Sequence, residues 1–271
     1  MKDQRDLLLD PTPLPPPWGR VEVAEGETTE WKLPYLTVWL RRSAGRLILA
    51  KAHRSPYLPE APEPTPPPDR AWHTFVLEER EQSLLFSPML PDLPVVIKPT
   101  SPLHLGPHLH TRLYAMLPLQ VQVSAIGDRR RPLVILDQVR WGRTWFGDFF
   151  DGEPCLWRYA ELTALPPATP GAHKALFPIE VHNLAGEELV IDKLCHRMDQ
   201  LALFCTDQAI WADTTVVHYH GDPGHVSVSH QGKAPGEVPH ALKVVRPRLE
   251  PNKGLVTRTF ASIKHFNIFM R

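Results

Sequence analysis

Histidine is the residue type that most strongly suggests chemistry in this sequence, because fourteen of the 271 residues are histidines and several lie close together. The segment from His218 to His225 also contains His220 and Asp222. Three imidazoles and one carboxylate form a donor set that can hold Zn²⁺ or Fe²⁺. Alternatively, His218 and His220 lie on the solvent side of a strand, with His225 beyond the next turn. The segment therefore predicts either a metal site or an ordinary strand and turn.

A second group contains His104, His108 and His110. On a strand, His108 and His110 would place two imidazoles on one face about 7 Å apart. Jelly-roll metalloenzymes of the cupin type use such a pair, but they also need a carboxylate a few residues later. Residues 111–116 contain none, so this group is the weaker metal candidate.

Nucleophilic catalysis has no local signature in the sequence. Cys195 and His196 are neighbours, and neighbours on a strand point to opposite faces, so they do not form a nucleophile–base pair. Cys195 and Cys205 lie in apolar runs, which is typical of buried free thiols. The odd total of three cysteines predicts reduced thiols in a reducing compartment. No G-x-S-x-G, P-loop, G-x-G-x-x-G or H-E-x-x-H motif occurs.

The densest aromatic segment begins at Trp141 and continues through Arg143, Trp145 and Phe146. Glycines beside these aromatic residues favour a tight bend in which the rings pack into the core. The alternative is a surface for a partner or ligand, formed by Trp141, Arg143, Trp145 and Phe146. A further option is a small-ligand pocket lined by Trp141, Trp145 or Trp157.

Proline determines the elements that must position these residues. The sequence contains 31 prolines in 271 residues, about twice the average usage. Each proline inside a helix costs about 3 kcal/mol, so long helices are excluded over most of the chain. Short β-like runs recur between the prolines and glycines. The main ones are residues 36–40, 46–50, 73–77, 95–97, 119–123, 133–136, 201–205, 214–219 and 225–229.

The clearest hairpin joins residues 177–183 to residues 188–192 through a turn that begins with Asn183. Further strands follow, as in the sheet of an immunoglobulin-like sandwich. The helix candidates are residues 154–165 and 255–269. The predicted fold is all-β, with two packed β-sandwich-like lobes, the second immunoglobulin-like, proline-rich loops and a short C-terminal helix.

Proline-rich stretches also suggest the domain boundaries. Residues 1–17 are expected to form an extended arm, residues 18–165 an N-terminal β lobe, and residues 170–271 a C-terminal β-sandwich lobe with the terminal helix. The stretch 55–69 is predicted to be a long loop.

Charge and hydropathy exclude several functions. Thirty basic and thirty acidic residues balance, so the overall charge favours neither nucleic acid nor an acidic membrane surface as a partner. The apolar runs are far shorter than the ~20 residues of a membrane helix, and residues 7–9 are too short for the core of a signal peptide. We expect a cytoplasmic protein with no transmembrane segment and no nucleic-acid partner.

Several motifs are spread from about Trp18 to Phe266: residues 88–96, 144–147, 181–183 with 189–191, 201–211, 246–248 and 258–260. This set resembles an uncharacterised prokaryotic family, domain of unknown function 432. The resemblance assigns no catalytic residue, because the family has no established activity. It implies a small bacterial or archaeal protein. Members are often encoded near small mechanosensitive channels, which makes such a channel the candidate partner.

Two functional hypotheses result. The first is a non-enzymatic protein-interaction or accessory module without a cofactor, which binds its partner through strand edges or an aromatic surface. The alternative is a metal-binding protein or metalloenzyme that holds Zn or Fe through His218, His220, Asp222 and His225.

Overall fold

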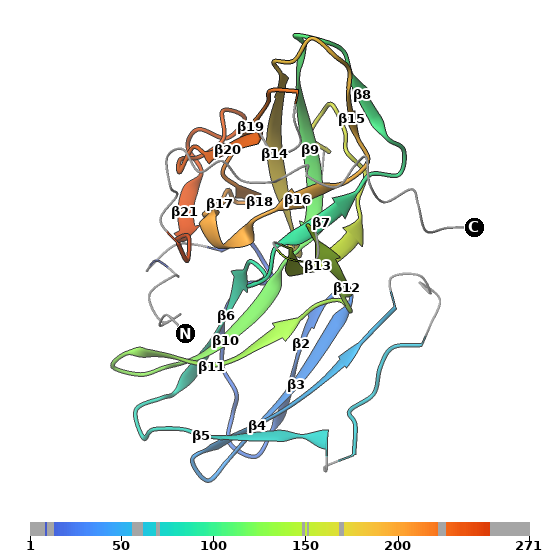
Figure 1. The fold of residues 1–271 in the computed structure, drawn as a ribbon. Helices are drawn as coiled ribbons and strands as arrows, with labels where there is room; N and C mark the ends of the chain where they lie inside the picture. The colour runs from blue at the N-terminus through green and yellow to red at the C-terminus, as the bar shows by residue number, and fades with distance from the viewer. Residues whose placement is uncertain are drawn as a thin grey trace, which may run out of the picture. The chain divides into compact units, whose positions relative to one another are not determined.

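The structure is a computed structural model that describes residues 9, 14–55, 62–68, 71–147, 150, 152–167, 171–221 and 226–249. Strands make up nearly all of its regular structure (Figure 1), and the all-β prediction is confirmed. The chain divides into two compact units. The first contains residues 1–89 and 118–140, and the second contains residues 90–117 and 141–271.

These units differ from the consecutive lobes 18–165 and 170–271 expected from the proline-rich break. The second unit takes in residues 90–117 as well as the strands that lie just before residue 165. Whether the two predicted segments are independent domains stays a prediction. Most of the predicted arm, residues 1–8 and 10–13, lies outside the described residues, and so does the predicted helix at 255–269.

The first unit contains two four-stranded antiparallel sheets, in the orders β1-β6-β10-β11 and β2-β3-β4-β5. Their strands are β1 (Gly19–Val21), β2 (Thr28–Leu33), β3 (Leu36–Ser43), β4 (Arg46–His53), β5 (His73–Val76), β6 (Ser83–Met89), β10 (Gln120–Ile126) and β11 (Arg130–Asp137). In β2, Trp31 and Leu33 are buried while Thr28, Glu30 and Lys32 are exposed. This period-2 alternation is typical of a strand with one wet face. The Trp31 ring packs 4.4 Å from that of Phe86 in the other sheet, which joins the two layers.

A buried carboxylate organises the connection between β5 and β6. Glu81 is only 3% exposed and accepts two hydrogen bonds from the Arg131 guanidinium, at 2.7 and 2.6 Å. It also accepts one from the Glu78 backbone N–H at 2.7 Å. The hydrogen bonds from Arg131 outweigh the effect of burial and lower the pKa of Glu81 below its ordinary value. The arginine-rich segment 129–131 thus supplies an ion pair within the first unit.

The second unit contains three sheets. Its strands are β7 (Val95–Lys98), β8 (Leu103–Leu105), β9 (His110–Pro118), β12 (Gly142–Phe146), β13 (Glu153–Tyr159), β14 (Lys174–Asn183), β15 (Leu189–Ile191), β16 (Leu194–His196), β17 (Leu203–Cys205), β18 (Ile210–Ala212), β19 (Thr215–Tyr219), β20 (Val226–His230) and β21 (Leu242–Val245). One sheet has the order β12-β13-β7-β16, and β15 pairs with β8. The largest contains β20, β19, β14, β18, β17 and β21, with β9 paired to β14.

The long strand β14 is the centre of the largest sheet. It pairs in parallel with both β18 and β19, whereas an immunoglobulin-type sheet consists of antiparallel strands. The predicted hairpin between residues 177–183 and 188–192 is wrong, because β15 pairs with β8 in the register Leu189↔Leu105. The alternating pattern identified both strands correctly, but not which strands they pair with.

The predicted helix at 154–165 is also wrong, because its whole first half lies in strand β13. The run Cys155-Leu156-Trp157 is apolar at consecutive positions, a pattern that suits a helix or a strand buried on both faces. In β13 the consecutive residues Cys155 and Leu156, whose side chains point to opposite faces of the sheet, are both buried. In the described part of the chain, no helix is long and apolar enough to cross a membrane.

The Glu81–Arg131 pair yields a first prediction. Glu81→Gln should lower the free energy of unfolding by about 2 kcal/mol, because it removes a buried charge that neutralises Arg131. Arg80→Ala is the matched control. It breaks an ion pair with Asp128 in which both side chains are mostly exposed, and it should cost about 0.5 kcal/mol or less. Urea denaturation measures both values, and equal losses would contradict this account.

Candidate functional site

The predicted aromatic surface lies on and beside β12, which pairs with β13. Phe146 is 6% exposed and packs with Val96, Cys155 and Cys195 in a core cluster. Arg143 and Trp145 lie at the alternate positions of the strand and are exposed, Trp145 by 52%. Trp141 is partly buried just before the strand. The exposed part of the predicted surface is therefore Arg143 and Trp145.

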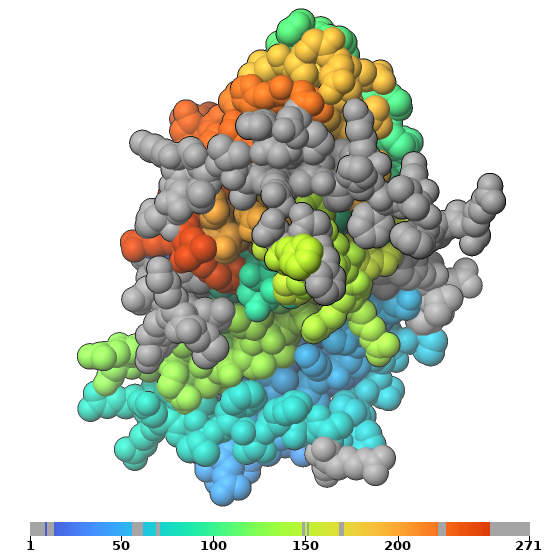
Figure 2. All heavy atoms as spheres, in the orientation of Figure 1, coloured from blue at the N-terminus to red at the C-terminus, as the bar shows by residue number. Residues whose placement is uncertain are grey.

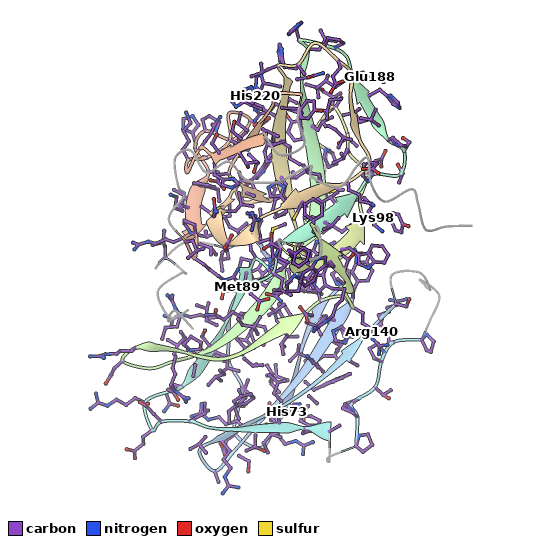
Figure 3. The ribbon with its side chains drawn as sticks, in the orientation of Figure 1. His73, Met89, Lys98, Arg140, Glu188 and His220 are labelled. Carbon is purple, nitrogen blue, oxygen red and sulfur yellow. The ribbon has the colours of Figure 1, made fainter. Side chains whose placement is uncertain are left out.

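The opposite face of the same two strands carries aromatic residues that the sequence analysis did not combine. The Lys98 ammonium lies 4.6 Å from the centre of the Trp157 ring and 5.9 Å from that of Tyr159. Lys98 is labelled in Figure 3. A Cβ at Gly142 would lie 2.1 Å from the Trp157 indole nitrogen. Glycine is needed at this position because the indole occupies the space of a side chain.

The histidines of the metal hypothesis are only partly within the described residues. His218 lies on β19 and His220 just after it, whereas Asp222 and His225 fall outside the description. Among the residues that the structure does describe, no group of three histidine, cysteine, aspartate or glutamate side chains is placed to hold a metal ion. Metal binding at His218, His220, Asp222 and His225 stays a prediction.

A row of imidazoles crosses three paired strands. His182 on β14 stacks on His110 of β9 with ring centres 5.5 Å apart, and its ring centre lies 4.9 Å from that of His218 on β19. A metal ion lies near the plane of each imidazole that binds it. The rings of His110 and His182 are inclined by only 16° and are stacked, so they do not converge on one ion in this arrangement. The other predicted group thus contributes His110 to the row, while His104 pairs with Glu188 at 3.2 Å.

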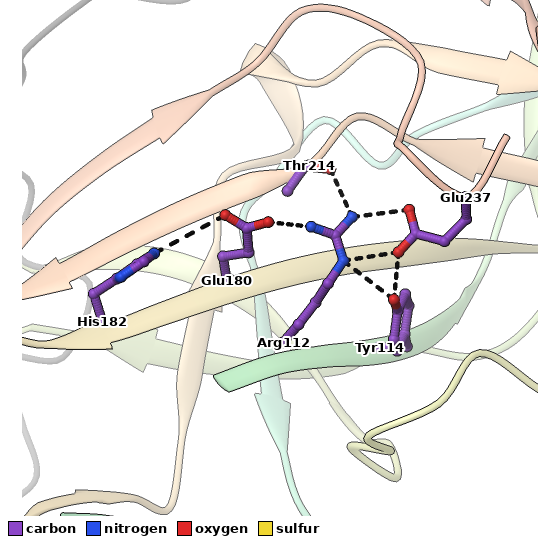
Figure 4. A network of polar contacts seen from close by, with 6 residues as sticks. All are labelled: Arg112, Tyr114, Glu180, His182, Thr214 and Glu237. Atoms are coloured by element: carbon purple, nitrogen blue, oxygen red, sulfur yellow. Dashed lines mark hydrogen bonds and ion pairs between the residues drawn. The ribbon is translucent and has the colours of Figure 1, made fainter. Parts of the chain in front are cut away.

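The most extensive polar network lies beside this row and is centred on Arg112 of β9 (Figure 4). Its guanidinium donates two hydrogen bonds to Glu237, at 2.7 and 2.8 Å, and one to Thr214 at 3.3 Å. It also donates to Glu180 of β14, while the Tyr114 hydroxyl donates to Glu237. Glu180 in turn lies 4.0 Å from His182. The network joins β9 and β14 to the segments that contain Thr214 and Glu237.

The network keeps Arg112 and Glu237 charged. Burial opposes the charge on Arg112, but the hydrogen bonds and negative charge of Glu237 raise the pKa of the guanidinium. Burial likewise opposes the charge on Glu237, and the hydrogen bonds from Arg112 and Tyr114 lower the pKa of this carboxylate below its ordinary value. A general acid at neutral pH needs a raised carboxyl pKa. The arrangement around Glu237 therefore suits a permanent ion pair better than proton transfer.

A second polar cluster is buried and uncharged. His196 is 3% exposed, and its Nε2 lies 2.8 Å from the Thr215 hydroxyl, which also lies 3.1 Å from Nδ1 of His230. Burial lowers the pKa of His196 to about 3 and that of His230 to about 4. Nearby, burial raises the pKa of Asp213 to about 6, although Ala202 and Gly232 donate backbone hydrogen bonds to it.

The three cysteines are buried thiols that form no disulfide bond. Contact with Cys155 and burial raise the pKa of Cys195 well above its ordinary value, and burial raises that of Cys205 to about 11. Both groups are protonated at neutral pH, and a thiol reacts as a nucleophile through its thiolate.

Comparison with known proteins places the chain in a family. The model of the family described as Protein of unknown function (DUF432) matches residues 17–265. The chain belongs to this family. No curated protein and no solved structure matches it. The family's description assigns no activity. Roles for residues of this DUF432 protein are therefore inferred from the contacts, burial and charges in its structure.

Sequence reasoning missed the Arg112 network in this DUF432 protein. Arg112 and Glu237 are 125 positions apart, and neither belongs to a recognisable motif. One available signal was Glu180, because a charged residue alternates with apolar Ile179 and Val181 on β14. That alternation indicates a polar face without showing which residues meet on it.

The Arg112 network predicts a strong coupling between its charges. Arg112→Met should lower the free energy of unfolding by about 3 kcal/mol, because Glu180 and Glu237 lose their cation. Glu237→Gln should destabilise the wild type but recover part of the loss in the Arg112→Met background. Urea denaturation of the four proteins gives the coupling energy. Simple addition of the two losses would contradict this interpretation.

The buried imidazoles predict loss of stability in acid. Both have a pKa in the folded state below that of an unfolded histidine, so the unfolded chain binds more protons as the pH falls from about 6.5 to 4. The free energy of unfolding should fall over this range. Asp213 acts in the opposite direction, because its pKa is raised.

The variant His230→Gln isolates the imidazole contribution. This variant should reduce the fall in the free energy of unfolding between about pH 6.5 and 4 by roughly 2–3 kcal/mol. His240→Gln is the matched control, because His240 is exposed, and it should leave the pH dependence of the free energy of unfolding unchanged. Denaturation curves at several pH values test this, and identical profiles for wild type and His230→Gln would reject it.

Proposed function

We propose that this protein is a non-enzymatic interaction module that binds a protein partner through the exposed side of β12. The observation that carries the proposal is the exposure of Trp145, 52% of whose surface is accessible on a strand at the end of its sheet. Arg143 is exposed two positions earlier on the same face of the strand. Tryptophan and arginine are the residues most enriched in the energetic centres of protein interfaces.

The backbone of β12 supports the same proposal. Within the described residues, β12 pairs with β13 alone. An end strand presents unpaired N–H and C=O groups on its outer side, to which an extended peptide can add as a further strand. A partner segment beside β12 would form this backbone ladder and contact Trp145 and Arg143 with its side chains.

The strand is held in place before any partner binds. The Trp157 indole lies against Gly142 of β12, and the Arg158 guanidinium lies 5.9 Å from the centre of the Trp141 ring. Phe146 anchors the other end in the core cluster. A rigid binding strand loses little conformational entropy on association, which favours affinity.

The finer parts of the proposal come from the family resemblance. They are a prokaryotic source, a cytoplasmic location and a small mechanosensitive channel as the partner. The channel is the candidate to test first, because an accessory module encoded beside a channel would meet it at the cytoplasmic membrane surface.

Binding of the purified protein to a small mechanosensitive channel in nanodiscs tests this proposal. Trp145→Ala and Arg143→Ala should each weaken binding by about tenfold or more. Val76→Ala is the matched control, because Val76 is 73% exposed on another end strand, β5, and this variant should bind like the wild type.

If the channel does not bind, it is not the partner, and cross-linking in a prokaryotic lysate tests the surface itself. A protein captured by wild type and Val76→Ala but lost with Trp145→Ala supports the surface. Identical capture by all three proteins rejects it.

A further inference from the structure

The loop between β4 and β5 carries a proline-rich segment on the surface of the first unit. We refer to residues 62–68 as the proline segment, because five of these seven residues are prolines: Pro62, Pro64, Pro66, Pro67 and Pro68. In Figure 1 it is the coloured stretch between two grey pieces on the way from β4 to β5. In the space-filling view, atoms of its blue-to-cyan colour lie at the surface on the lower right of the picture (Figure 2).

The sequence restricts the backbone of the proline segment to the polyproline II conformation. Every residue from 62 to 68 is a proline or directly precedes one. The proline ring fixes φ at about −65°, and its contact with the preceding residue pushes that residue out of the helical region into extended conformations. These are the angles of polyproline II, a helix with about three residues per turn and no internal hydrogen bonds. The segment accordingly contains neither α-helix nor strand.

Burial along the proline segment follows the same three-residue period. Pro64 and Pro67 are half-buried, and their spacing of three places them on one face of a polyproline II helix. This face is turned toward the rest of the first unit. The other two faces are open to solvent, because all the remaining residues of the segment are exposed: Pro62, Glu63, Thr65, Pro66 and Pro68.

Polar contacts hold the segment at both ends. Near its start, the Glu63 carboxylate accepts a hydrogen bond from the Arg54 guanidinium at 2.9 Å. Near its end, the Trp72 indole N–H donates to the Pro67 carbonyl at 2.9 Å. The Arg41 guanidinium in turn lies 4.9 Å from the centre of the Trp72 ring. The proline segment is therefore fixed on the sheet β2-β3-β4-β5 with its exposed faces outward.

Packing within the protein does not account for the exposed prolines. A cavity of about 290 Å³ is lined by Pro64 of the segment and by Leu33 and Thr37 of β2 and β3, so even the inward face is only loosely packed. The Thr65 and Pro66 carbonyls accept no hydrogen bond from any described residue. The rings and carbonyls on the outer faces are thus available to another molecule.

We propose that the proline segment is a docking site for a protein domain whose groove is lined with aromatic side chains. Such grooves, as in SH3 and WW domains, bind polyproline II helices because these helices are already formed and lose little entropy on binding. The groove would contact the exposed Pro62, Thr65, Pro66 and Pro68, and its tyrosine or tryptophan donors would reach the open carbonyls. This surface lies in the first unit and shares no residue with the β12 surface.

The chemistry of the segment disfavours other kinds of partner. Its only backbone N–H groups are those of Glu63 and Thr65, so a partner strand could not form a regular ladder beside it. The segment contains no lysine or arginine, so it has no cation for the phosphates of a nucleic acid. Uncharged rings on a rigid extended backbone suit an aromatic groove.

Binding of purified polyproline-reading domains to the full-length protein tests the proposal. The probes are a set of SH3 and WW domains with different sequence preferences, each titrated onto the wild type by isothermal calorimetry. At least one should bind saturably. No saturable binding by any of them would reject the proposal, and the prolines would then serve only to stiffen the loop.

Variants assign the binding to the outer faces of the segment. Pro66→Ala and Pro68→Ala should each weaken binding of the positive domain by about tenfold, because each removes two methylene groups from the contact. Pro64→Ala, on the inward face, should weaken binding less than either. Pro102→Ala is the matched control, because Pro102 is an exposed proline of the second unit outside any proline run, and it should bind like the wild type. Melting temperatures show that each variant is folded.

Three outcomes count against the proposal. Equal binding by the wild type, Pro66→Ala and Pro68→Ala would place the contact elsewhere, for example on the proline-rich residues 11–17. A larger loss with Pro64→Ala than with Pro66→Ala would contradict the assigned faces. A loss with Trp145→Ala would assign the domain to the β12 surface, whereas unchanged binding by this variant keeps the two proposals separate.

Discussion

Backbone pairing along β14 is the interaction on which the second unit depends. This ten-residue strand pairs with β9, β18 and β19, and its side chains alternate between two environments. Ile179, Val181 and Asn183 are fully buried, while Glu180 and His182 lie on the other face. A shift of the pairing by one residue would exchange these faces and place a carboxylate and an imidazole in the core. The register of β14 thus positions the Arg112 network, the imidazole row and the buried side chain of Asn183, whose amide donates hydrogen bonds to neighbouring backbone carbonyls.

The second unit accommodates polar side chains away from bulk water in two different ways. Around Arg112, opposite charges are paired: Glu180 and Glu237 each accept a hydrogen bond from the cation, and Glu237 accepts another from Tyr114. Around Thr215, the two histidines stay neutral and share one hydroxyl group. The charged network around Arg112 requires several long side chains from distant segments. The neutral group around Thr215 requires only burial, because burial favours the uncharged form of each imidazole.

Local patterns were sufficient to predict the all-β class and about half of the strands. Proline density excluded helices, and alternation in segments such as residues 119–123 indicated strands that the structure contains. Pairing between distant strands was not predictable, because it depends on contacts that no local pattern encodes: β15 pairs with β8 although about 85 residues separate them. The apolar run in β13 was mistaken for a helix, because Cys155 and Leu156 are buried on opposite faces of the strand and the run therefore shows no alternation.

The candidate sites were predictable only where one segment carries them. Trp145 and Arg143 were identified because both lie in the aromatic segment, and strand alternation explains why their neighbour Phe146 is in the core. Arg112, Glu180 and Glu237 come from three separate segments, so only the folded chain brings them together. The Asn183 side chain likewise links two turns, through the carbonyls of Leu105, Gly106 and Glu187, although the sequence marked this residue only as the start of one turn.

The interleaved sequence ranges of the two units affect how the gene can be divided. Residues 90–117 belong to the second unit, yet they lie between two parts of the first. A fragment ending near residue 165 would contain every strand of the first unit together with β7, β8, β9, β12 and β13. It would lack β14 and β15, which pair with β9 and β8, and β16, which is one of the two partners of β7. The open edges of β7, β8 and β9 would favour association between copies. Splitting this gene at a single point therefore separates strands that stabilise each other, and we expect only the undivided chain to fold.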